Sequence, residues 1–149
     1  MRSLGIDYGV RRVGVAISDP LNSIAMGVAT LQVKSMKDAV TKVSEICHEK
    51  NASTIVVGLP LNMNGTIGPM AEKVERFVEQ LREVTGIEVV TSDERLSSAM
   101  AERTLLEADM SRQKRKGVID KLAAQVILQG YLDRIGFEQL SDMTEDESV

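Results

Sequence analysis

The chain has few of the residues that carry disulfide frameworks, aromatic binding platforms or membrane spans. Its 149 residues include one cysteine, which excludes an internal disulfide and favours a reducing compartment. Aromatic residues make up 3% of the chain and tryptophan is absent, so we expect an aliphatic core and no broad surface for stacking bases. There is no run of about 18 apolar residues, and the N-terminus lacks the apolar stretch of a signal peptide. These absences predict a cytoplasmic protein that does not bind membranes.

The motifs of several enzyme classes are also missing. The sequence has no GxxxxGK[ST] phosphate loop, and Gly5, Gly9 and Gly14 do not fit the GxGxxG spacing of dinucleotide-binding proteins. The single histidine, His48, follows Cys47 in a predicted helix, where adjacent side chains point about 100° apart and make a poor nucleophile–base pair. We therefore expect Cys47 to be a small core residue. The sequence also lacks a Cys/His cluster that would bind zinc.

The net charge of −4 conceals an uneven distribution. Residues 138–149 hold five acids and no base, whereas the preceding 137 residues hold 18 basic and 17 acidic side chains. This composition predicts an acidic, disordered tail after a nearly neutral domain at 1–137. Two basic groups stand out in that domain, and local clusters matter more for phosphate binding than the net charge does. They are Arg11 with Arg12, and Arg112, Lys114, Arg115, Lys116 and Lys121. A solvated loop is the alternative interpretation of the second group.

Hydrophobic patterns predict the element order βββαβαβαα. The predicted strands are 3–8, 13–18, 26–33, 54–58 and 87–91, and the predicted helices are 35–50, 69–84, 97–108 and 118–135. Short connections between the first three strands favour antiparallel pairing, whereas the later alternation of strands and helices favours parallel pairing. We therefore expect an α/β fold with a mixed five-stranded sheet, antiparallel in its first three strands, and with helices on both faces.

Three acidic residues stand where a solvated side chain is not expected. Asp7 interrupts an apolar run, Glu94 follows the strand at 87–91, and Asp120 lies beside the apolar face of the last helix. A buried, unpaired carboxylate is costly, so Asp7 is expected to have a cation, a metal or strong donors nearby. Each also has an ordinary interpretation: a turn cap for Asp7, an S/T-x-x-E capping box for Glu94, and a cap or first-turn acid for Asp120.

If the three carboxylates meet, their mutual repulsion calls for hard cations. Mg²⁺ takes a few carboxylates and fills its other positions with water and phosphate oxygens. Two such ions about 4 Å apart activate a water and stabilise the leaving oxygen of a phosphodiester. Asp7, Glu94 and Asp120 are therefore predicted to hold Mg²⁺ or Mn²⁺, as two ions, and to be the catalytic residues of a nuclease.

Four segments resemble the YqgF-type family, which is described both as Holliday-junction-resolvase-like nucleases and as nucleases that mature pre-16S ribosomal RNA. The segments are GIDYGVRRVGVAISD at 5–19, VVGLPLNMNGTIGP at 56–69, SDERLSS at 92–98 and KGVIDKLAAQVILQGYLD at 116–133. They span essentially all of the chain except its tail, and their order makes the resemblance specific. One departure is Asn64, because the family loop often reads NMDG where this chain reads NMNG.

The resemblance implies an RNase H-like fold and a nuclease site whose acids match Asp7, Glu94 and Asp120. It implies structured nucleic acid as substrate, above all the 5′ end of pre-16S ribosomal RNA, and the precursor of the small ribosomal subunit as a partner. The remaining site residues are expected to contact phosphates and to guide nucleic acid to the acids. These residues are Arg11, Arg12, Arg95, Arg112, Lys114, Arg115 and Lys116.

Other functions remain open at this point. A Holliday junction in DNA is the alternative substrate, because the fold does not choose between RNA and DNA. A non-catalytic nucleic-acid-binding module is a second alternative, and it predicts that Asp7→Asn changes no activity. The DxG turn at 7–9 also fits nucleotide-hydrolysing enzymes of the actin and sugar-kinase type, but those close two domains around ATP, and this chain has room for one.

Overall fold

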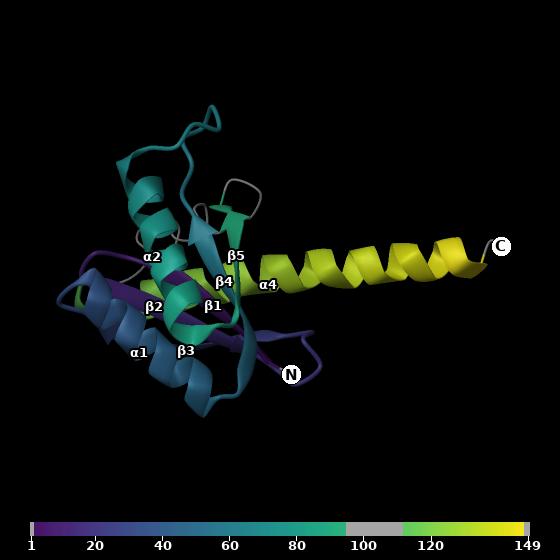
Figure 1. Cartoon of the computed structure of the whole chain (residues 1–149), viewed down its shortest axis with the longest axis horizontal. Helices are drawn as coiled ribbons and strands as arrows, with labels where there is room; N and C mark the ends of the chain where they lie inside the picture. Colours follow the sequence, from purple (N-terminus) through teal and green to yellow (C-terminus); the bar gives the residue numbers. More distant parts are fainter. Residues whose placement is uncertain (1, 95–111, 148–149) are drawn as a thin grey trace.

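The computed structural model describes residues 2–94 and 112–147, with the side chains of residues 2–94 and 118–139. Its strands are β1 (Arg2–Tyr8), β2 (Arg12–Ser18), β3 (Ala25–Gln32), β4 (Ala52–Leu59) and β5 (Glu88–Asp93). Its helices are α1 (Met36–Glu49), α2 (Pro69–Thr85) and α4 (Arg112–Glu147) (Figure 1). The five strands and the first two helices lie within a few residues of their predicted positions. The helix predicted at 97–108 lies outside the described residues.

The strands form one sheet in the order β3-β2-β1-β4-β5. β2 pairs antiparallel with both β1 and β3, whereas β4 pairs parallel with both β1 and β5. This arrangement confirms the predicted mixed sheet. β1 is the central strand, so Asp7 near its carboxyl end has a neighbouring strand on each side.

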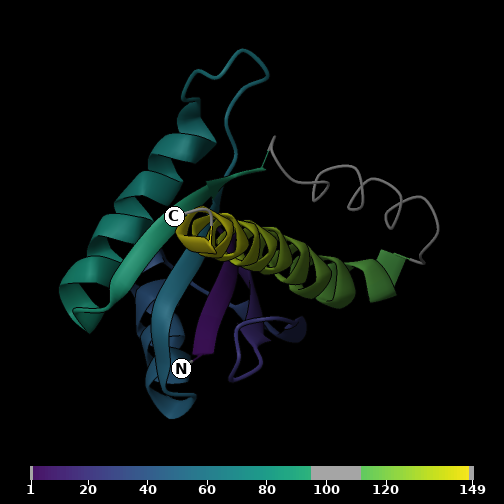
Figure 2. The same cartoon turned by 90° about the vertical axis from the view of Figure 1, so that its right-hand side faces the viewer.

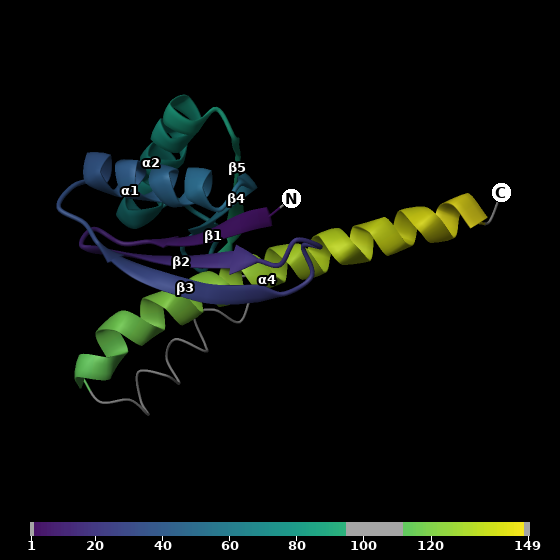
Figure 3. The same cartoon turned by 90° about the horizontal axis from the view of Figure 1, so that it is seen from below.

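Helices α1 and α2 cover one face of the sheet (Figure 3). Alternate residues of the strands point to this face and pack with the apolar sides of both helices into the larger of two buried clusters. Phe77 of α2 is fully buried and stacks on the ring of Tyr8, with the ring centroids 4.5 Å apart. Aliphatic side chains fill most of the remaining core, as the low aromatic content predicts.

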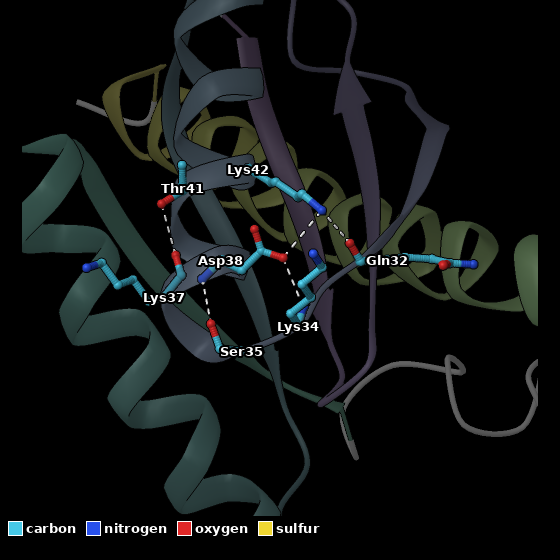
Figure 4. Close-up of polar contacts among 7 residues, drawn as sticks. All are labelled: Gln32, Lys34, Ser35, Lys37, Asp38, Thr41 and Lys42. Atoms are coloured by element: carbon cyan, nitrogen blue, oxygen red, sulfur yellow. Dashed lines mark hydrogen bonds and ion pairs between the residues drawn. The ribbon is translucent and has the colours of Figure 1, made fainter.

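The start of α1 is fixed by side chains that bond to the free N–H groups of its first turn (Figure 4). Ser35 Oγ accepts a hydrogen bond from the Asp38 amide at 3.1 Å, and Asp38 Oδ2 accepts one from the Lys34 amide at 2.9 Å. Lys42 Nζ lies 3.3 Å from the same carboxylate oxygen and donates to the carbonyl of Gln32 at 2.6 Å. The network therefore joins the end of β3 to α1. The hydrogen bond from Lys34 is the largest cause that lowers the pKa of Asp38.

Helix α4 lies on the opposite face of the sheet from α1 and α2 (Figure 2). Four strands each present a glycine to it, and a Cβ atom added at any of them would collide with the helix. We call these residues the glycine row: Gly27 in β3, Gly14 in β2, Gly5 in β1 and Gly58 in β4. A Cβ at Gly5 would lie 2.6 Å from the Cβ of Leu128, and one at Gly14 would overlap the carbonyl oxygen of Asp120. The helix is thus seated directly on the backbone of the sheet.

Helix α4 also reaches β3, the strand at one end of the sheet. Gln125 Oε1 accepts a hydrogen bond from the Gly27 amide at 3.0 Å, and Gln129 Oε1 accepts one from the Ala25 amide at 2.8 Å. An edge strand normally presents such amides to solvent or to another strand. Here side chains of α4 occupy them.

Helix α4 is longer than the predicted helix at 118–135, because it begins at Arg112 and continues to Glu147. Gly117 does not start it: one internal glycine costs only about 1 kcal/mol, and the basic residues beside it favour a helix. The tail predicted as disordered from residue 138 is helical to Glu147. Its composition forms no core, but a helix needs only its own backbone hydrogen bonds and extends readily from a docked segment. Within the described residues, no helix is both long and apolar enough to span a membrane.

Candidate active site

The three predicted acids line a single pocket of about 200 Å³. Its walls come from the ends of β1 and β4, the start of β2, the residue after β5, and helices α2 and α4. The lining residues are Asp7, Tyr8, Gly9, Arg12, Gly58, Pro60, Met70, Glu94 and Asp120. Residues separated by more than 100 positions in the sequence therefore meet at the carboxyl end of the parallel strands, where sites of α/β sheets usually lie.

Asp7 occupies the floor of the pocket because of the strand register. It is 8% exposed and pairs across the β1–β2 ladder with Gly14. Gly14 lies directly under the backbone of Asp120, so the register that sets Asp7 beside Gly14 also brings it towards α4. The preceding residue, Ile6, pairs with Val57 of β4, which places Asp7 level with the end of that strand.

Glu94 enters the pocket from the end of β5. It is 8% exposed, and a Cβ atom at Gly58 would lie 2.7 Å from its Oε1, so its carboxylate rests against the backbone of β4. A glycine at position 58 is what leaves room for it. The alternative of a capping box involves a helix outside the described residues, so that interpretation stays a prediction.

Asp120 reaches the pocket from the interior of α4. The helix begins at Arg112, so the interpretation of Asp120 as a cap or first-turn acid is wrong. Its Oδ2 lies 2.8 Å from Nε of Arg12, and the two side chains are 18% and 38% exposed, respectively. The sequence assigns Arg12 to phosphate contact and gives no sign of this ion pair, because the two residues are 108 positions apart.

The donor set suits a hard divalent cation, although the acids are not gathered around one point. Among the described residues, no three Asp, Glu, His or Cys side chains group closely enough to ligate one ion together. Mg²⁺ does not need such a cage, because it is commonly held by one or two carboxylates, with water and substrate phosphates at its other positions. The buried carboxylates of Asp7 and Glu94 beside Asp120 meet that requirement.

The structure describes the side chains of only some of the predicted phosphate-binding residues. Arg11 is exposed in the turn between β1 and β2, next to Arg12. Arg95 lies outside the described residues. The bases at 112–116 form the beginning of α4, with the backbone alone described, and Asp120 follows on the same helix. At 1.5 Å per residue, these bases lie roughly 6–12 Å along the helix axis from Asp120.

The loop at 60–68 borders the pocket through Pro60. Asn64 Oδ1 accepts hydrogen bonds from the amide and the hydroxyl of Thr66, at 3.1 and 2.6 Å. Asn62 adds a backbone bond from its amide to the carbonyl of Thr66 at 3.0 Å. Asn64 therefore orders the turn of this loop.

A larger hollow of about 430 Å³ lies away from these acids, between the ends of α1 and α2. It is lined by Ser44, Glu45, His48, Glu49, Val84, Thr85 and Ile87. Its acids are on the solvent side of α1, so it lacks the buried carboxylates that distinguish the smaller pocket. Cys47 points away into the core, 1% exposed, and burial raises its thiol pKa. The prediction that Cys47 is a core residue is confirmed.

Comparison with known proteins settles the family. A family model described as "RuvX: Holliday junction resolvase" matches residues 1–134. The chain belongs to this family. A Bacillus cytotoxicus protein provisionally named a pre-16S rRNA nuclease is 53% identical over 135 residues, which are 89% of this chain and 98% of that protein. A Clostridium botulinum (strain Hall) protein of the same name is 50% identical over 135 residues, 91% of this chain and 98% of its own. Both descriptions name nucleases, the enzymes that hydrolyse phosphodiester bonds.

Solved structures identify the fold. RuvC of T. thermophilus in complex with a Holliday junction substrate matches with a TM-score of 0.55 at 18% identity, over 91% of this chain and 96% of that one. The fowlpox virus Holliday junction resolvase matches with a TM-score of 0.51 at 13% identity, over 90% and 99% of the two chains. At these identities the likeness concerns the fold alone. It confirms the expected RNase H-like fold of the RuvC type.

Proposed function

We propose that this RuvX-family chain is a metal-dependent endonuclease that cleaves structured nucleic acid, with Asp7, Glu94 and Asp120 as its catalytic acids. We further propose the 5′ end of pre-16S ribosomal RNA as its substrate and the small-subunit precursor as the particle on which it acts. The observation that carries the proposal is the meeting of three acids from separate elements in one pocket, two of them only 8% exposed. Buried carboxylates gathered in this way tend to mark functional sites.

Different residues of the pocket have different proposed roles. The carboxylates of Asp7 and Glu94 would hold Mg²⁺ from the floor and one wall, and Asp120 would complete the site from α4. When bound, the ion supplies an activated water and stabilises charge on the leaving oxygen. Pro60 and Met70 line the same pocket and would add apolar contact beside the scissile phosphate. Arg11, exposed in the turn before Arg12, would contact a neighbouring phosphate.

Two substrates have support. The pre-16S RNA is favoured by relatives at 50% identity or more that span nearly the whole chain. A Holliday junction is favoured by the description of the matching family. Either is read mainly through backbone and shape, because the four aromatic residues of the sequence provide no broad stacking surface: Tyr8 and Phe77 are already packed together in the core.

The test is cleavage of matched substrates by one preparation of the full chain. A pre-16S RNA fragment that includes the 5′ precursor segment, a single-stranded RNA and a four-way DNA junction are each incubated with Mg²⁺, with Mn²⁺ and with EDTA. Asp7→Asn is the test variant. Asp133→Asn is the matched control, because it makes the same change at an exposed site of α4 away from the pocket.

The expected result is cleavage of the RNA near the mature 5′ end, lost with EDTA and reduced by at least about 10³-fold in Asp7→Asn, in keeping with the loss of one catalytic group. Asp133→Asn should cleave like the parent. If the DNA junction is cleaved faster than the RNA, the junction becomes the proposed substrate, and the proposal of metal-dependent cleavage by the three acids stands. Equal activity of Asp7→Asn and the parent would refute the assignment of the acids, and tight binding without cleavage by either would favour the non-catalytic module.

A further inference from the structure

The ion pair between Arg12 and Asp120 places a cation inside the pocket. Its Nε–Oδ2 distance is 2.8 Å, and both residues line the same 200 Å³ pocket as Asp7 and Glu94. Arg12 is the one base among the described residues that line this pocket, against three acids. The guanidinium therefore offsets part of the repulsion among the three carboxylates that line this pocket.

The contribution of this ion pair to the free energy of folding is too small to explain its presence. Arg12 is 38% exposed, and a single pair at that exposure contributes little net free energy because water screens it. Helix α4 is already held to the sheet by the buried cluster around Ile127 and Leu128 and by the glycine row. What the pair does fix is the rotamer of Asp120, and it occupies a carboxylate oxygen that a divalent cation would otherwise take.

We propose that Arg12 is a positioning residue that holds Asp120 until a divalent cation displaces it, and that the freed guanidinium then turns to the nucleic-acid phosphate. This inference rests on the proposed function. Arg12 stands at the first position of β2, beside the exposed Arg11, and its side chain is 38% exposed, so the guanidinium borders solvent, where a phosphate would approach. Cation and phosphate binding are then coupled, because each favours the arrangement in which Arg12 has left Asp120.

The coupling predicts opposite effects of one substitution. In Arg12→Ala, the guanidinium no longer competes for Asp120, so the affinity for Mn²⁺ in the absence of nucleic acid should rise about tenfold, which corresponds to about 1.4 kcal/mol. The affinity for nucleic acid measured in Ca²⁺ should fall by a similar factor, because one phosphate contact is lost. Arg12→Lys keeps the charge without the planar fork and should lie between the two. A residue that merely keeps α4 in place would weaken both kinds of binding.

The experiment measures Mn²⁺ binding to the full chain by the loss of the free-ion EPR signal, and compares the parent, Arg12→Ala and Lys37→Ala. Lys37 is an exposed base on α1, so its removal changes the net charge equally without touching the pocket. In the parent, the Arg12 Nε–H signal in NMR spectra, assigned by its absence in Arg12→Lys, should shift and lose protection when Mg²⁺ is added. Equal gains in Mn²⁺ affinity from Arg12→Ala and Lys37→Ala would reduce the effect to net charge and overturn the inference.

Failure of this inference is distinguishable from failure of the proposed function. If Mn²⁺ binds the parent but Arg12→Ala binds it no more tightly, or if the Arg12 signal ignores Mg²⁺, the inference is overturned while metal-dependent cleavage by the parent still supports the proposed function. If the parent binds no Mn²⁺ and Asp7→Asn does not change cleavage, both are overturned.

Discussion

Replacing Gly14 by alanine adds one methyl group at the point where α4 touches the sheet. The new Cβ would overlap the carbonyl oxygen of Asp120 and crowd its carbonyl carbon, and both are backbone atoms that no rotamer change can move away. Real Cβ atoms essentially never approach a neighbour closer than 3.0 Å, so the helix must retreat by roughly 1 Å or more. Gly14 is also the ladder partner of Asp7, so the retreat separates two of the three acids.

The expected cost follows from these contacts. Overpacking of a filled interior typically costs 1–3 kcal/mol, and a clash with backbone belongs at the upper end, so we expect about 3 kcal/mol. In a chain of this length that is a fall in Tm of roughly 6–12 °C. Displacement of a catalytic group by about 1 Å typically costs about 10²-fold in rate, so cleavage should fall by that factor even well below Tm.

Thermal unfolding by circular dichroism and cleavage at 25 °C measure the two effects. Gly136→Ala is the control, because a Cβ there meets nothing within 4 Å and alanine improves helix propensity by up to about 1 kcal/mol. Gly27→Ala should cost less than Gly14→Ala, because its nearest neighbour is a side-chain carbon of Lys121 at 2.5 Å. If Gly14→Ala kept the parent's Tm and rate, the close seating of α4 on the glycine row would be refuted.

Three further outcomes follow from the described contacts. Phe77→Ala should lower the free energy of unfolding in urea by about 3–5 kcal/mol, because it empties the largest fully buried side chain and removes the stacking on Tyr8. The lowered pKa of Asp38 stabilises the folded state above its unfolded pKa, so the protection of the Lys34 amide against exchange, relative to an unfolded chain at the same pH, should fall as pH drops below about 4 in the parent, whereas Asp38→Asn should show no such pH step. Cys47 should react with a thiol reagent only at the rate of opening, because it is buried and its pKa is raised; rapid labelling of the native chain would contradict its place in the core.

Most of the secondary structure was predictable because each element carries its own signal. The continuous apolar run of β4 and the 3.6-residue stripe of α1 depend on local residues alone. The convergence of Asp7 and Glu94 was also within reach, since both stand at the carboxyl ends of predicted strands. Asp120 was found through its place on the apolar face of the last helix. The ends of that helix were not predictable, because a docked helix extends beyond its apolar segment through backbone hydrogen bonds that leave no hydrophobic pattern in the sequence.

The sequence did not predict the close contact between α4 and the glycine row, nor the Arg12–Asp120 ion pair, for a different reason. The members of the glycine row are irregularly spaced along the chain, and only strand pairing aligns them beneath the helix. A glycine inside a buried strand, such as Gly14 or Gly58, is a usable sign that another segment passes close by. An ion pair across 108 positions leaves no comparable mark, because either partner alone resembles an ordinary charged residue.

The glutamines of α4 that bond to β3 have a consequence for assembly. With Gln125 and Gln129 bound to the amides of Gly27 and Ala25, an incoming strand finds the first part of this edge already occupied. Growth of the sheet at this end, whether by a second copy of the chain or by an extended peptide, requires the two glutamines to give up their hydrogen bonds to β3. Because Asp120 stands on the same helix as these glutamines, a strand that pairs here competes with contacts of the helix that carries one acid of the pocket.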